Sequence, residues 1–597
     1  MSENQAKTAS TLTSDERLSS LRERALRWAE SDPDPNTQRE LRALLARGDR
    51  EASQLLQERF GGRLSFGTAG LRGPVSFGPN AMCSALVRRV SLALGLHLRA
   101  QHNGADTRQR VVIGFDARHG STRFAEEAAR ALGGLGFEVH LASKEAPTPL
   151  LAHAVCDLKA VAGVMVTASH NPPQDNGFKV YWGNGAQIIP PHDKLISAQI
   201  DEVGDGSRYP RPSLDELRAS GLIHELSGTQ GDRYEQALLE ARLGSPALAP
   251  ALKVTYTAMH GVGASWYERV MRAGGFEALS FVQEQREPDP DFPTVSFPNP
   301  EEPGALDLAL ACAEAEGAHL LLAHDPDADR LAVVARDQDG ALRAFTGDQL
   351  GALIAHELFE VLPLRGEPLS HKQLVATTIV SSSLLGVMAE TNGVQSRETL
   401  TGFKWIANAA LAHEAEGGRF LFGYEEAIGY SVGALVRDKD GVSAALFVAD
   451  MAARALAEGK TLWDRMDEVY QRYGVFVSSQ VNRVRPGAAG KEEIAGWMRR
   501  LREAPPKEIA GLEVTEQTDF AELPAPMTGD VLRYRLAGGG RVIVRPSGTE
   551  PKIKVYLEAR ATLTEEAEGG VSPLDGARAR AHDQLHKLTQ AVEALLS

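Results

Sequence analysis

The chain has little of what marks a secreted or membrane-bound protein. Only 3 cysteines occur among its 597 residues, and their odd number and wide spacing fit neither a disulfide framework nor a zinc site. No apolar run reaches the roughly 18 residues that span a membrane, and the N-terminal segment lacks the apolar core of a signal peptide. These absences predict a soluble, cytoplasmic protein with reduced thiols.

An excess of positive charge is also absent. Lys and Arg number 64 against 79 Asp and Glu, which gives a formal net charge of −15. Such a chain has no general electrostatic attraction to nucleic acid or to anionic lipid, so we expect neither as a partner. An anionic small-molecule substrate would need local positive charge at its site.

What the chain does contain is an alternation of apolar strands and amphipathic helices. A strand at 111–115, a helix at 121–135 and a strand at 138–142 form the βαβ pattern of a largely parallel sheet. The pattern returns from residue 252 and from residue 374, which predicts a threefold repeat of α/β units. From about residue 475 onward, strands and a long final helix predict a separate α+β domain.

We therefore predict five segments. They are a helical extension at 1–60, α/β domains at 61–212, 213–337 and 338–473, and an α+β domain at 474–597. In the extension, Thr13 and Thr37 are each followed three residues later by Glu, the pattern of a helix-capping box. We expect linkers near 204–212, 337–340 and 472–474.

In each α/β unit a second apolar strand ends in a polar loop. These strands lie at 161–166, 320–323 and 420–422, and they lead to Ser169, Asp325 and Gly423. Ligands of open α/β sheets bind beyond the carboxyl ends of the strands. The three loops are therefore candidate site loops.

The first of these loops, TASHNPPQDNGFK at 167–179, offers a nucleophile. Ser169 follows the strand directly, His170 is its neighbour and Lys179 lies ten residues further on. A hydroxyl beside a base is a candidate for covalent catalysis, although most loop serines only cap a turn or are solvated. The case for a catalytic Ser169 becomes stronger because other loops of the chain suit the same chemistry.

The second loop, HDPDADR at 324–330, offers a metal site. Asp325, Asp327 and Asp329 alternate along the loop, so an extended backbone can aim all three carboxylates at one point. Three such charges need a cation, and ligation by oxygen alone suits Mg²⁺. The alternative, a solvated acidic turn, is disfavoured by the apolar strands on both sides.

Two further stretches suit phosphate groups. FGTAGLRG at 66–73 surrounds Arg72 with small residues, so the backbone and the guanidinium can approach an anion closely. RPSGTEPK at 545–552 offers Arg545, two hydroxyls and the N–H groups around Gly548 as a phosphate cradle. Judged alone, each could be an ordinary surface turn.

A last group of residues suits a sugar. GYEEAIG at 423–429 offers Glu425 and Glu426 as acceptors for sugar hydroxyls. TGFK at 401–404 and RDKDG at 437–441 add cations nearby in the sequence. One polypeptide thus carries the groups needed to move phosphoryl groups on sugars.

These motifs resemble those of the α-D-phosphohexomutase superfamily, and within it the phosphoglucomutase-2-like (phosphoglucomutase/phosphomannomutase) branch. The resemblance runs from about residue 60 to the C-terminus through the motifs at 66–73, 167–179, 325–330, 401–404, 423–429 and 545–552. It implies three related α/β domains with mixed sheets and a C-terminal α+β domain with a TATA-binding-protein-like fold, all around one cleft.

The resemblance also implies roles. Ser169 would rest as phosphoserine and share a Mg²⁺ ion with Asp325, Asp327 and Asp329. The residues implied in catalysis besides Ser169 are His170, Lys179, Arg72 and Lys439. Those implied in substrate binding are Arg330, Thr401, Gly402, Lys404, Glu425, Glu426, Arg545, Ser547, Gly548 and Thr549.

The implied reaction is the interconversion of glucose 1-phosphate and glucose 6-phosphate, with glucose 1,6-bisphosphate as intermediate and activator. Ala427 stands where many phosphoglucomutases carry a serine, which leaves the choice of sugar open. Phosphopentomutase, phosphomannomutase and glucose-1,6-bisphosphate synthase activities therefore stay open, as do a hydrolase and an inactive sugar-phosphate sensor. We expect small sugar phosphates as partners and a monomer, with a dimer as the alternative.

Overall fold

The structure is a computed structural model. It describes residues 14–66, 70–101, 108–226, 228–547, 551–563 and 571–596. The predicted cap Thr13 and the candidate phosphate-binding residues Gly548 and Thr549 lie outside these ranges, as do Gly67, Thr68 and Ala69 of the glycine-rich stretch.

The described part of the N-terminal extension contains three helices: α2 (Ser14–Ser31), α3 (Pro35–Ala46) and α4 (Arg50–Phe60). Helix α3 begins before the predicted cap Thr37, because Asp34 accepts a hydrogen bond from the Asn36 N–H and Pro35 fits the first turn. Trp28 and Phe60 pack edge to face. The buried side chains of the extension share one hydrophobic core with the first sheet, so it is packed on the first domain as predicted.

The first sheet has six strands in the order β1-β5-β4-β2-β3-β6. They are β1 (Leu71–Pro74), β2 (Arg110–Phe115), β3 (Glu138–Ala142), β4 (Ala162–Val166), β5 (Asp175–Trp182) and β6 (Ile223–Leu226). The strands β4, β2, β3 and β6 are parallel, whereas β5 pairs antiparallel with both β4 and β1. Its helices are α5 (Ser84–Gln101), α6 (Ser121–Gly134), α7 (Thr148–Asp157), α8 (His192–Val203) and α9 (Leu214–Ala219).

The second sheet has the order β11-β10-β9-β7-β8 and again mixes parallel and antiparallel pairs. Its strands are β7 (Val254–Thr257), β8 (Leu279–Phe281), β9 (Leu320–Ala323), β10 (Ala332–Arg336) and β11 (Leu342–Ala344). The helices of this part are α10 (Gly228–Ala241), α11 (Ala264–Ala273) and α12 (Asp307–Glu316).

The third sheet has the order β13-β12-β14-β15, with β15 antiparallel at its edge. Its strands are β12 (Gln373–Thr378), β13 (Gln395–Thr399), β14 (Arg419–Glu425) and β15 (Gly429–Val432). Its helices are α13 (Gly347–Leu364), α14 (Leu384–Thr391), α15 (Phe403–Ala415), α16 (Gly441–Ala457) and α17 (Leu462–Tyr473). Mixed sheets in three α/β domains confirm the predicted fold class.

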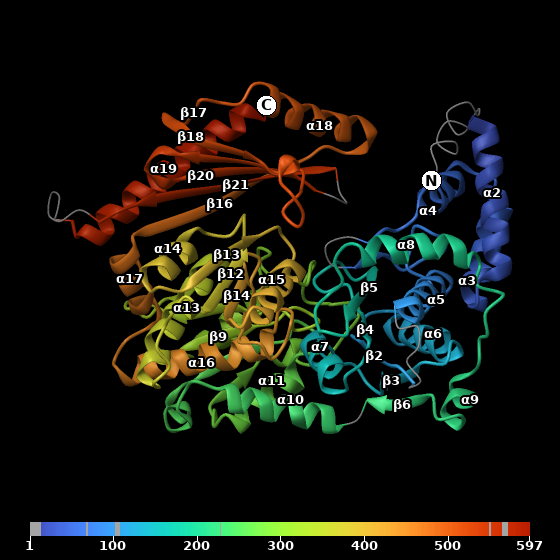
Figure 1. Ribbon diagram of the computed structural model, residues 1–597, viewed down its shortest axis with the longest axis horizontal. Helices are drawn as coiled ribbons and strands as arrows, with labels where there is room; N and C mark the ends of the chain where they lie inside the picture. The colour runs from blue at the N-terminus through green and yellow to red at the C-terminus, as the bar shows by residue number, and fades with distance from the viewer. Residues whose placement is uncertain are drawn as a thin grey trace.

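The fourth sheet is wholly antiparallel, in the order β16-β21-β20-β19-β18-β17. Its strands are β16 (Val475–Val484), β17 (Glu508–Ile509), β18 (Leu512–Asp519), β19 (Leu532–Leu536), β20 (Arg541–Pro546) and β21 (Lys552–Ala561). Figure 1 shows this sheet, in orange and red, between the third domain and the helices α18 (Gly487–Glu503) and α19 (Pro573–Leu595). The predicted C-terminal α+β domain is confirmed.

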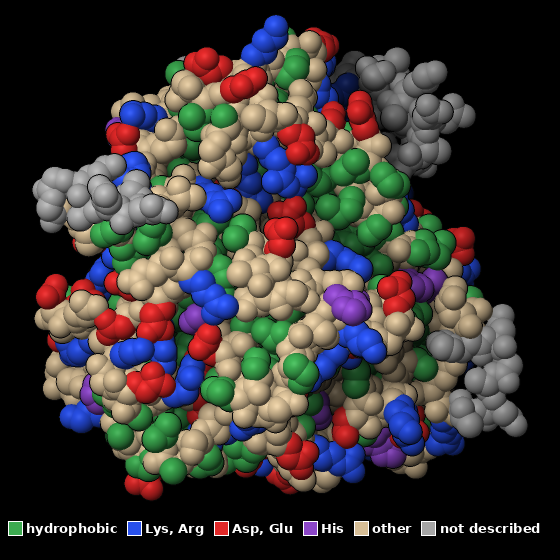
Figure 2. Space-filling model, turned by 60° about the vertical axis from the view of Figure 1, so that its left-hand side comes forward, with side chains coloured by type: hydrophobic (Ala, Val, Ile, Leu, Met, Phe, Trp, Pro, Cys, Tyr) green, Lys and Arg blue, Asp and Glu red, His purple; other side chains and the backbone are tan. Residues whose placement is uncertain are grey.

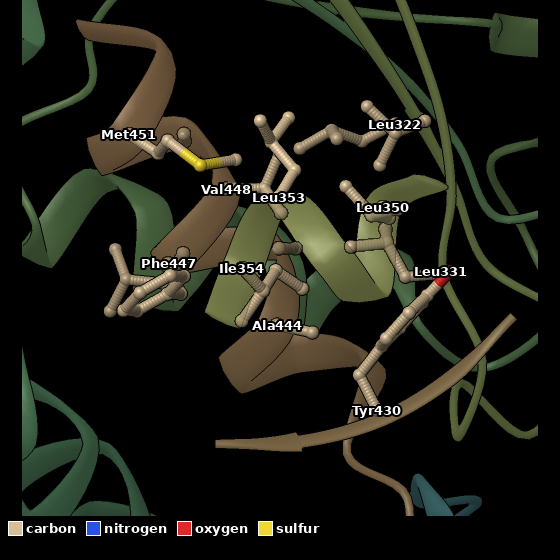
Figure 3. Close-up of a cluster of buried hydrophobic side chains, with 14 of the residues drawn as sticks. Leu322, Leu331, Leu350, Leu353, Ile354, Tyr430, Ala444, Phe447, Val448 and Met451 are labelled. Atoms are coloured by element: carbon tan, nitrogen blue, oxygen red, sulfur yellow. The ribbon is translucent and has the colours of Figure 1, made fainter. Parts of the chain in front are cut away.

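The second and third domains share one core. In Figure 3, Leu353 and Ile354 of α13 pack with Phe447, Val448 and Met451 of α16 close to Leu322 of β9. The fourth domain has a hydrophobic cluster of its own, and some of its buried side chains also belong to the core of the second and third domains. The loop after β9 therefore lies next to the core that the two domains share.

Sheet pairing differs from the predicted segment limits at two points. Strand β6 pairs with β3, so the first sheet continues past residue 212. Strand β11 pairs with β10, and the expected linker at 337–340 is the turn of that hairpin. We propose domain boundaries after Leu226 and after Ala344.

The predicted end of the strand at 420–422 is wrong. Strand β14 continues through Gly423 to Glu425, because it pairs with β12 on one side and β15 on the other. The turn that follows is 426–428, and Ile428 has a φ of 53° there. Within the described residues, no helix combines the length and apolar character that crossing a bilayer requires.

Candidate active site

Ser169 lies at the mouth of β4, almost fully buried at 1% exposure. Its φ of 53° is unusual for a residue other than glycine and costs on the order of 1 kcal/mol. The Ser169 N–H donates to Thr167 Oγ1 at 2.8 Å, and its hydroxyl donates to Asp325 Oδ2 at 2.7 Å. His170 Nδ1 lies 3.2 Å from the same hydroxyl. The structure thus joins the serine loop to the acidic loop of the second domain.

Arg118 holds the serine loop in this conformation. Its guanidinium donates to four backbone carbonyls of the loop, those of Ser169 (2.6 Å), Pro172 (2.8 Å), Asp175 (3.2 Å) and Asn171. The side chain is buried, and Asp116 Oδ2 lies 3.5 Å from its Nε. The sequence analysis missed Arg118, although it follows the end of a predicted strand just as Ser169 and Asp325 do.

The three aspartates of the acidic loop converge as predicted. Ala328 adopts a φ of 53°, which turns the loop, and one carboxylate oxygen from each of Asp325, Asp327 and Asp329 lies within 4.8 Å of the others. The Oδ1 atoms of Asp327 and Asp329 are buried and have no hydrogen-bond partner among the described residues. Buried carboxylate oxygens without partners fit a divalent cation with oxygen ligands, such as Mg²⁺.

Two buried lysines balance part of this charge. Lys179 on β5 donates to Asp327 Oδ2 and Asp329 Oδ2, both at 2.8 Å. Lys439, in the loop before α16, lies 3.2 Å from Asp329 Oδ2. Burial opposes the charged form of both lysines, but the neighbouring aspartates outweigh it and raise the pKa of each.

These surroundings shift the pKa values of the aspartates in different directions. Burial, together with the charges of Asp327 and Asp329, raises the pKa of Asp325. The pKa of Asp329 is lowered, because Lys179 and Lys439 overcome the effect of burial. A cation bound among the three would favour the charged form of them all.

Positively charged and neutral basic groups line the mouth of the site. Arg72 on β1 donates to Asn171 Oδ1 at 3.3 Å, and the Arg330 N–H donates to Asp325 Oδ1 at 3.1 Å. Burial and the nearby charges of Arg330 and Arg72 lower the pKa of His170 well below its usual range. His170 is therefore neutral near pH 7 and can act as a hydrogen-bond acceptor or donor.

The positive charge at this site is a local feature, because the chain as a whole carries a net negative charge. On the face in Figure 2, basic and acidic side chains are interspersed over most of the area. The guanidinium and ammonium groups named above come from five separate segments, and the fold brings them together around the serine loop. This supplies the local positive charge that an anionic substrate requires.

The two glutamates of the 423–429 loop, called the sugar loop below, contact different partners. Glu425 Oε1 accepts a hydrogen bond from the Gly402 N–H at 2.8 Å, so this loop and the 401–404 loop meet. Glu426 is turned inward and accepts from Ser381 Oγ at 2.9 Å. Burial and the charges of Glu425 and Asp348 raise the pKa of Glu426 to about 7.

The described candidates of the phosphate loop, Arg545 and Ser547, line a cavity between the third and fourth domains. This cavity of about 500 Å³ is lined by Thr401 on one side and by Arg545, Ser547 and Lys552 on the other. Lys404 lies in the first turn of α15 with its ammonium 5.8 Å from the Trp405 ring. The 401–404 loop therefore joins the sugar loop to the cavity beside the phosphate loop.

One further residue of the site was not predicted. Thr148, at the start of α7, donates from Oγ1 to Asp327 Oδ2 at 2.6 Å, and its N–H donates to the Asp327 carbonyl at 3.0 Å. The sequence PTP around it carries a turn signal but no sign of a metal-loop contact. Its contact with Asp327 becomes evident only in the structure, where the first and second domains meet.

Comparison with known proteins agrees with this geometry. Four family models match in order, described as phosphoglucomutase/phosphomannomutase alpha/beta/alpha domains I (residues 63–206), II (232–340) and III (346–473) and the C-terminal domain (505–569). The chain belongs to the phosphoglucomutase/phosphomannomutase family, and so to the mutases of the phosphohexomutase superfamily.

Individual relatives span nearly the whole chain. A mouse phosphopentomutase is 36% identical over 584 residues, covering 93% of this chain and 92% of its own. A human glucose 1,6-bisphosphate synthase is 34% identical over 580 residues, covering 92% and 91%. The solved structure of pp63/parafusin, a Paramecium phosphoglucomutase in its open form, shares the fold with a TM-score of 0.67 at 18% identity, covering 90% and 96%.

Proposed function

We propose that this enzyme interconverts glucose 1-phosphate and glucose 6-phosphate through a phosphorylated Ser169. One observation carries the proposal: the Ser169 hydroxyl donates to Asp325 of an aspartate cluster in which two buried oxygens have no hydrogen-bond partner within the described part of the chain. Phosphoryl transfer requires a nucleophile beside a cation site, and this arrangement supports assigning those roles to Ser169 and the aspartates.

In the first step the free 6-hydroxyl of glucose 1-phosphate attacks the phosphorus of phosphoserine. The new O–P bond forms as the bond to Ser169 Oγ breaks, the sugar hydroxyl loses its proton and Oγ recovers one. Glucose 1,6-bisphosphate results. After the sugar turns round, Ser169 Oγ loses its proton and attacks the phosphorus at carbon 1. The bond from that phosphorus to the sugar oxygen breaks, the oxygen takes up a proton, and glucose 6-phosphate leaves as phosphoserine is restored.

The side chains around Ser169 supply the proton movements and the charge. Lys179 and Lys439 are the candidate acids and bases, and His170 supports the serine loop. Asp325, Asp327 and Asp329 would hold Mg²⁺, which neutralises charge on the transferring phosphoryl group.

Substrate recognition is assigned to the outer loops. Arg72 and Arg330 would orient the reacting phosphate, and Glu425 would accept hydrogen bonds from sugar hydroxyls. Thr401, Gly402 and Lys404 would line the sugar site. The distal phosphate would be held by Arg545, Ser547, Gly548 and Thr549. We assign Glu426 a supporting role, because Ser381 holds its carboxylate away from the sugar loop.

A second candidate is the same chemistry on a pentose. Phosphopentomutase and phosphoribomutase are the names of mouse and yeast relatives that each cover at least 90% of this chain. Ribose 1-phosphate and ribose 5-phosphate carry the same two ends at a shorter separation. The predicted cytoplasmic location and monomeric state stay predictions.

The test is a coupled assay of glucose 6-phosphate formation, with Mg²⁺ and trace glucose 1,6-bisphosphate. Ribose 1-phosphate is run in parallel with trace ribose 1,5-bisphosphate. Ser169→Ala should abolish turnover, whereas the matched control Ser91→Ala, a buried serine of α5, should keep it. Full turnover by Ser169→Ala would overturn the mechanism, and turnover on ribose alone would move the proposal to the pentose.

A further inference from the structure

A set of buried polar groups from the first and third domains surrounds Lys439. Asp438, exposed by only 1%, accepts from Tyr181 Oη at 2.7 Å and from Gln187 Nε2 at 2.6 Å. Its other oxygen, Oδ1, lies 3.4 Å from Lys439 Nζ and also accepts from the Lys439 N–H at 2.8 Å. The two carboxylate oxygens of Asp438 thus have different partners: Oδ2 contacts the first domain and Oδ1 contacts Lys439.

The first domain presents its two donors through local backbone geometry. Tyr181 stands two residues after Lys179 on β5, so both side chains leave the same face of the strand. An isolated antiparallel bridge pairs Tyr181 with Gln187, which brings the amide beside the phenol. One strand therefore directs Lys179 toward the aspartate cluster and Tyr181 toward Asp438.

The contacts close into a ring. Lys179 and Lys439 both reach Asp329 Oδ2, Lys439 reaches Asp438, and Asp438 returns to Tyr181 on the strand of Lys179. Lysine has four rotatable side-chain bonds and makes no fixed fork. Without Asp438, the Lys439 ammonium would be restrained mainly by Asp329 and by the Phe403 ring 5.7 Å away.

We propose that Asp438 is the positioning residue for Lys439 and that Tyr181 and Gln187 fix Asp438 from the first domain. The inference rests on the proposed function, in which Lys439 exchanges a proton with the sugar or the serine oxygen. The contact of the first domain with the third would then set the position of the ammonium that meets the reacting groups. Asp438 itself touches no reacting atom.

The experiment is a double-mutant cycle on kcat with Asp438→Asn, Lys439→Met and the double variant. Loss of a hydrogen bond to a charged group predicts a fall in kcat of about tenfold to a hundredfold for Asp438→Asn, with KM changed by less than about threefold. The double variant should match Lys439→Met, because a residue that acts through the lysine has no effect once the lysine is gone.

Tyr181→Phe gives a second, milder arm should Asp438→Asn fail to fold. We expect a fall in kcat of about threefold to tenfold, the loss of one hydrogen bond to a carboxylate. Tyr234→Phe is its matched control: Tyr234 Oη donates to Asp440 at 2.8 Å in the same loop, where Asp440 caps α16 and does not face Lys439. That control should keep kcat within about twofold.

The outcomes distinguish a failure of the positioning role of Asp438 from a failure of the proposed function. Losses that multiply in the double variant, an unchanged kcat in Asp438→Asn, or equal losses in Tyr181→Phe and Tyr234→Phe would overturn the positioning role. Wild-type turnover by Lys439→Met would also overturn it, while leaving the serine mechanism intact. Wild-type turnover by Ser169→Ala would instead refute the proposed function.

Discussion

Arg118→Lys is the substitution that most sharply tests how the serine loop is held. Arg118 makes four hydrogen bonds to loop carbonyls through two guanidinium nitrogens. A lysine keeps the charge but has one nitrogen, and it cannot reach carbonyls spread over seven residues of chain. If two bonds from a charged donor are lost at about 1.5 kcal/mol each, the loop loses about 3 kcal/mol.

That energy exceeds the roughly 1 kcal/mol that a positive φ costs Ser169, so the loop should relax away from the productive conformation. About 3 kcal/mol expressed in the transition state lowers kcat about a hundredfold. The assay is steady-state turnover of glucose 1-phosphate, with the thermal midpoint measured beside it.

The matched control is Arg88→Lys. Arg88 is equally buried in the same domain and donates to the carbonyls of Gly206, Tyr209 and Pro210, far along the chain from the serine loop. We expect a comparable loss of thermal stability in both variants but a large loss of kcat only in Arg118→Lys. Equal kcat losses, or wild-type turnover by Arg118→Lys, would refute the reasoning.

Three further predictions concern the metal site and the extension. Removing divalent cations with a chelator should abolish turnover, and added Mg²⁺ should restore it; turnover without any metal would contradict the aspartate assignment. Thr148→Val removes a hydrogen bond to Asp327 and should raise the Mg²⁺ concentration for half-maximal activity about tenfold. The control Thr255→Val, which removes a buried hydroxyl without a partner among the described residues, should leave that concentration unchanged. Burial raises the pKa of Asp32 from 3.8 to about 6, so ionisation of Asp32 destabilises the fold as pH rises through that range. Asp32→Asn should therefore stabilise the protein at pH 7.5 by up to about 3 kcal/mol and by progressively less as pH falls towards 4; an equal shift in the exposed-site control Asp339→Asn, or no shift in thermal midpoint, would contradict this.

The strands and their terminal loops were predictable because each depends on local pattern. Apolar runs such as 111–115 and 320–323 become strands within a residue or two of the expected ends. Polar residues that follow them, such as Ser169 and Asp325, could be assigned to a site because ligands of open α/β sheets bind beyond the carboxyl ends of the strands. Alternating aspartates could be assigned to one metal site for the same local reason.

Contacts between segments far apart in the sequence were not predictable in this way. Arg118, Thr148 and Asp438 act through partners 51, 179 and 251 positions away in the sequence, and no local periodicity records such pairs. Glu426 illustrates the converse. Its position in the sugar loop suggested a substrate contact, but the side chain is turned toward Ser381 by the continued pairing of β14.

The central claim is that Ser169 carries the phosphoryl group during turnover. Incubation with glucose 1,6-bisphosphate, followed by peptide mass spectrometry, tests it directly. The account predicts one added phosphoryl group on the peptide that contains Ser169, and transfer of that group to glucose 1-phosphate when this sugar is supplied as acceptor. Phosphate on another residue, or a stable phosphoserine that no sugar can discharge in an active preparation, would contradict the account.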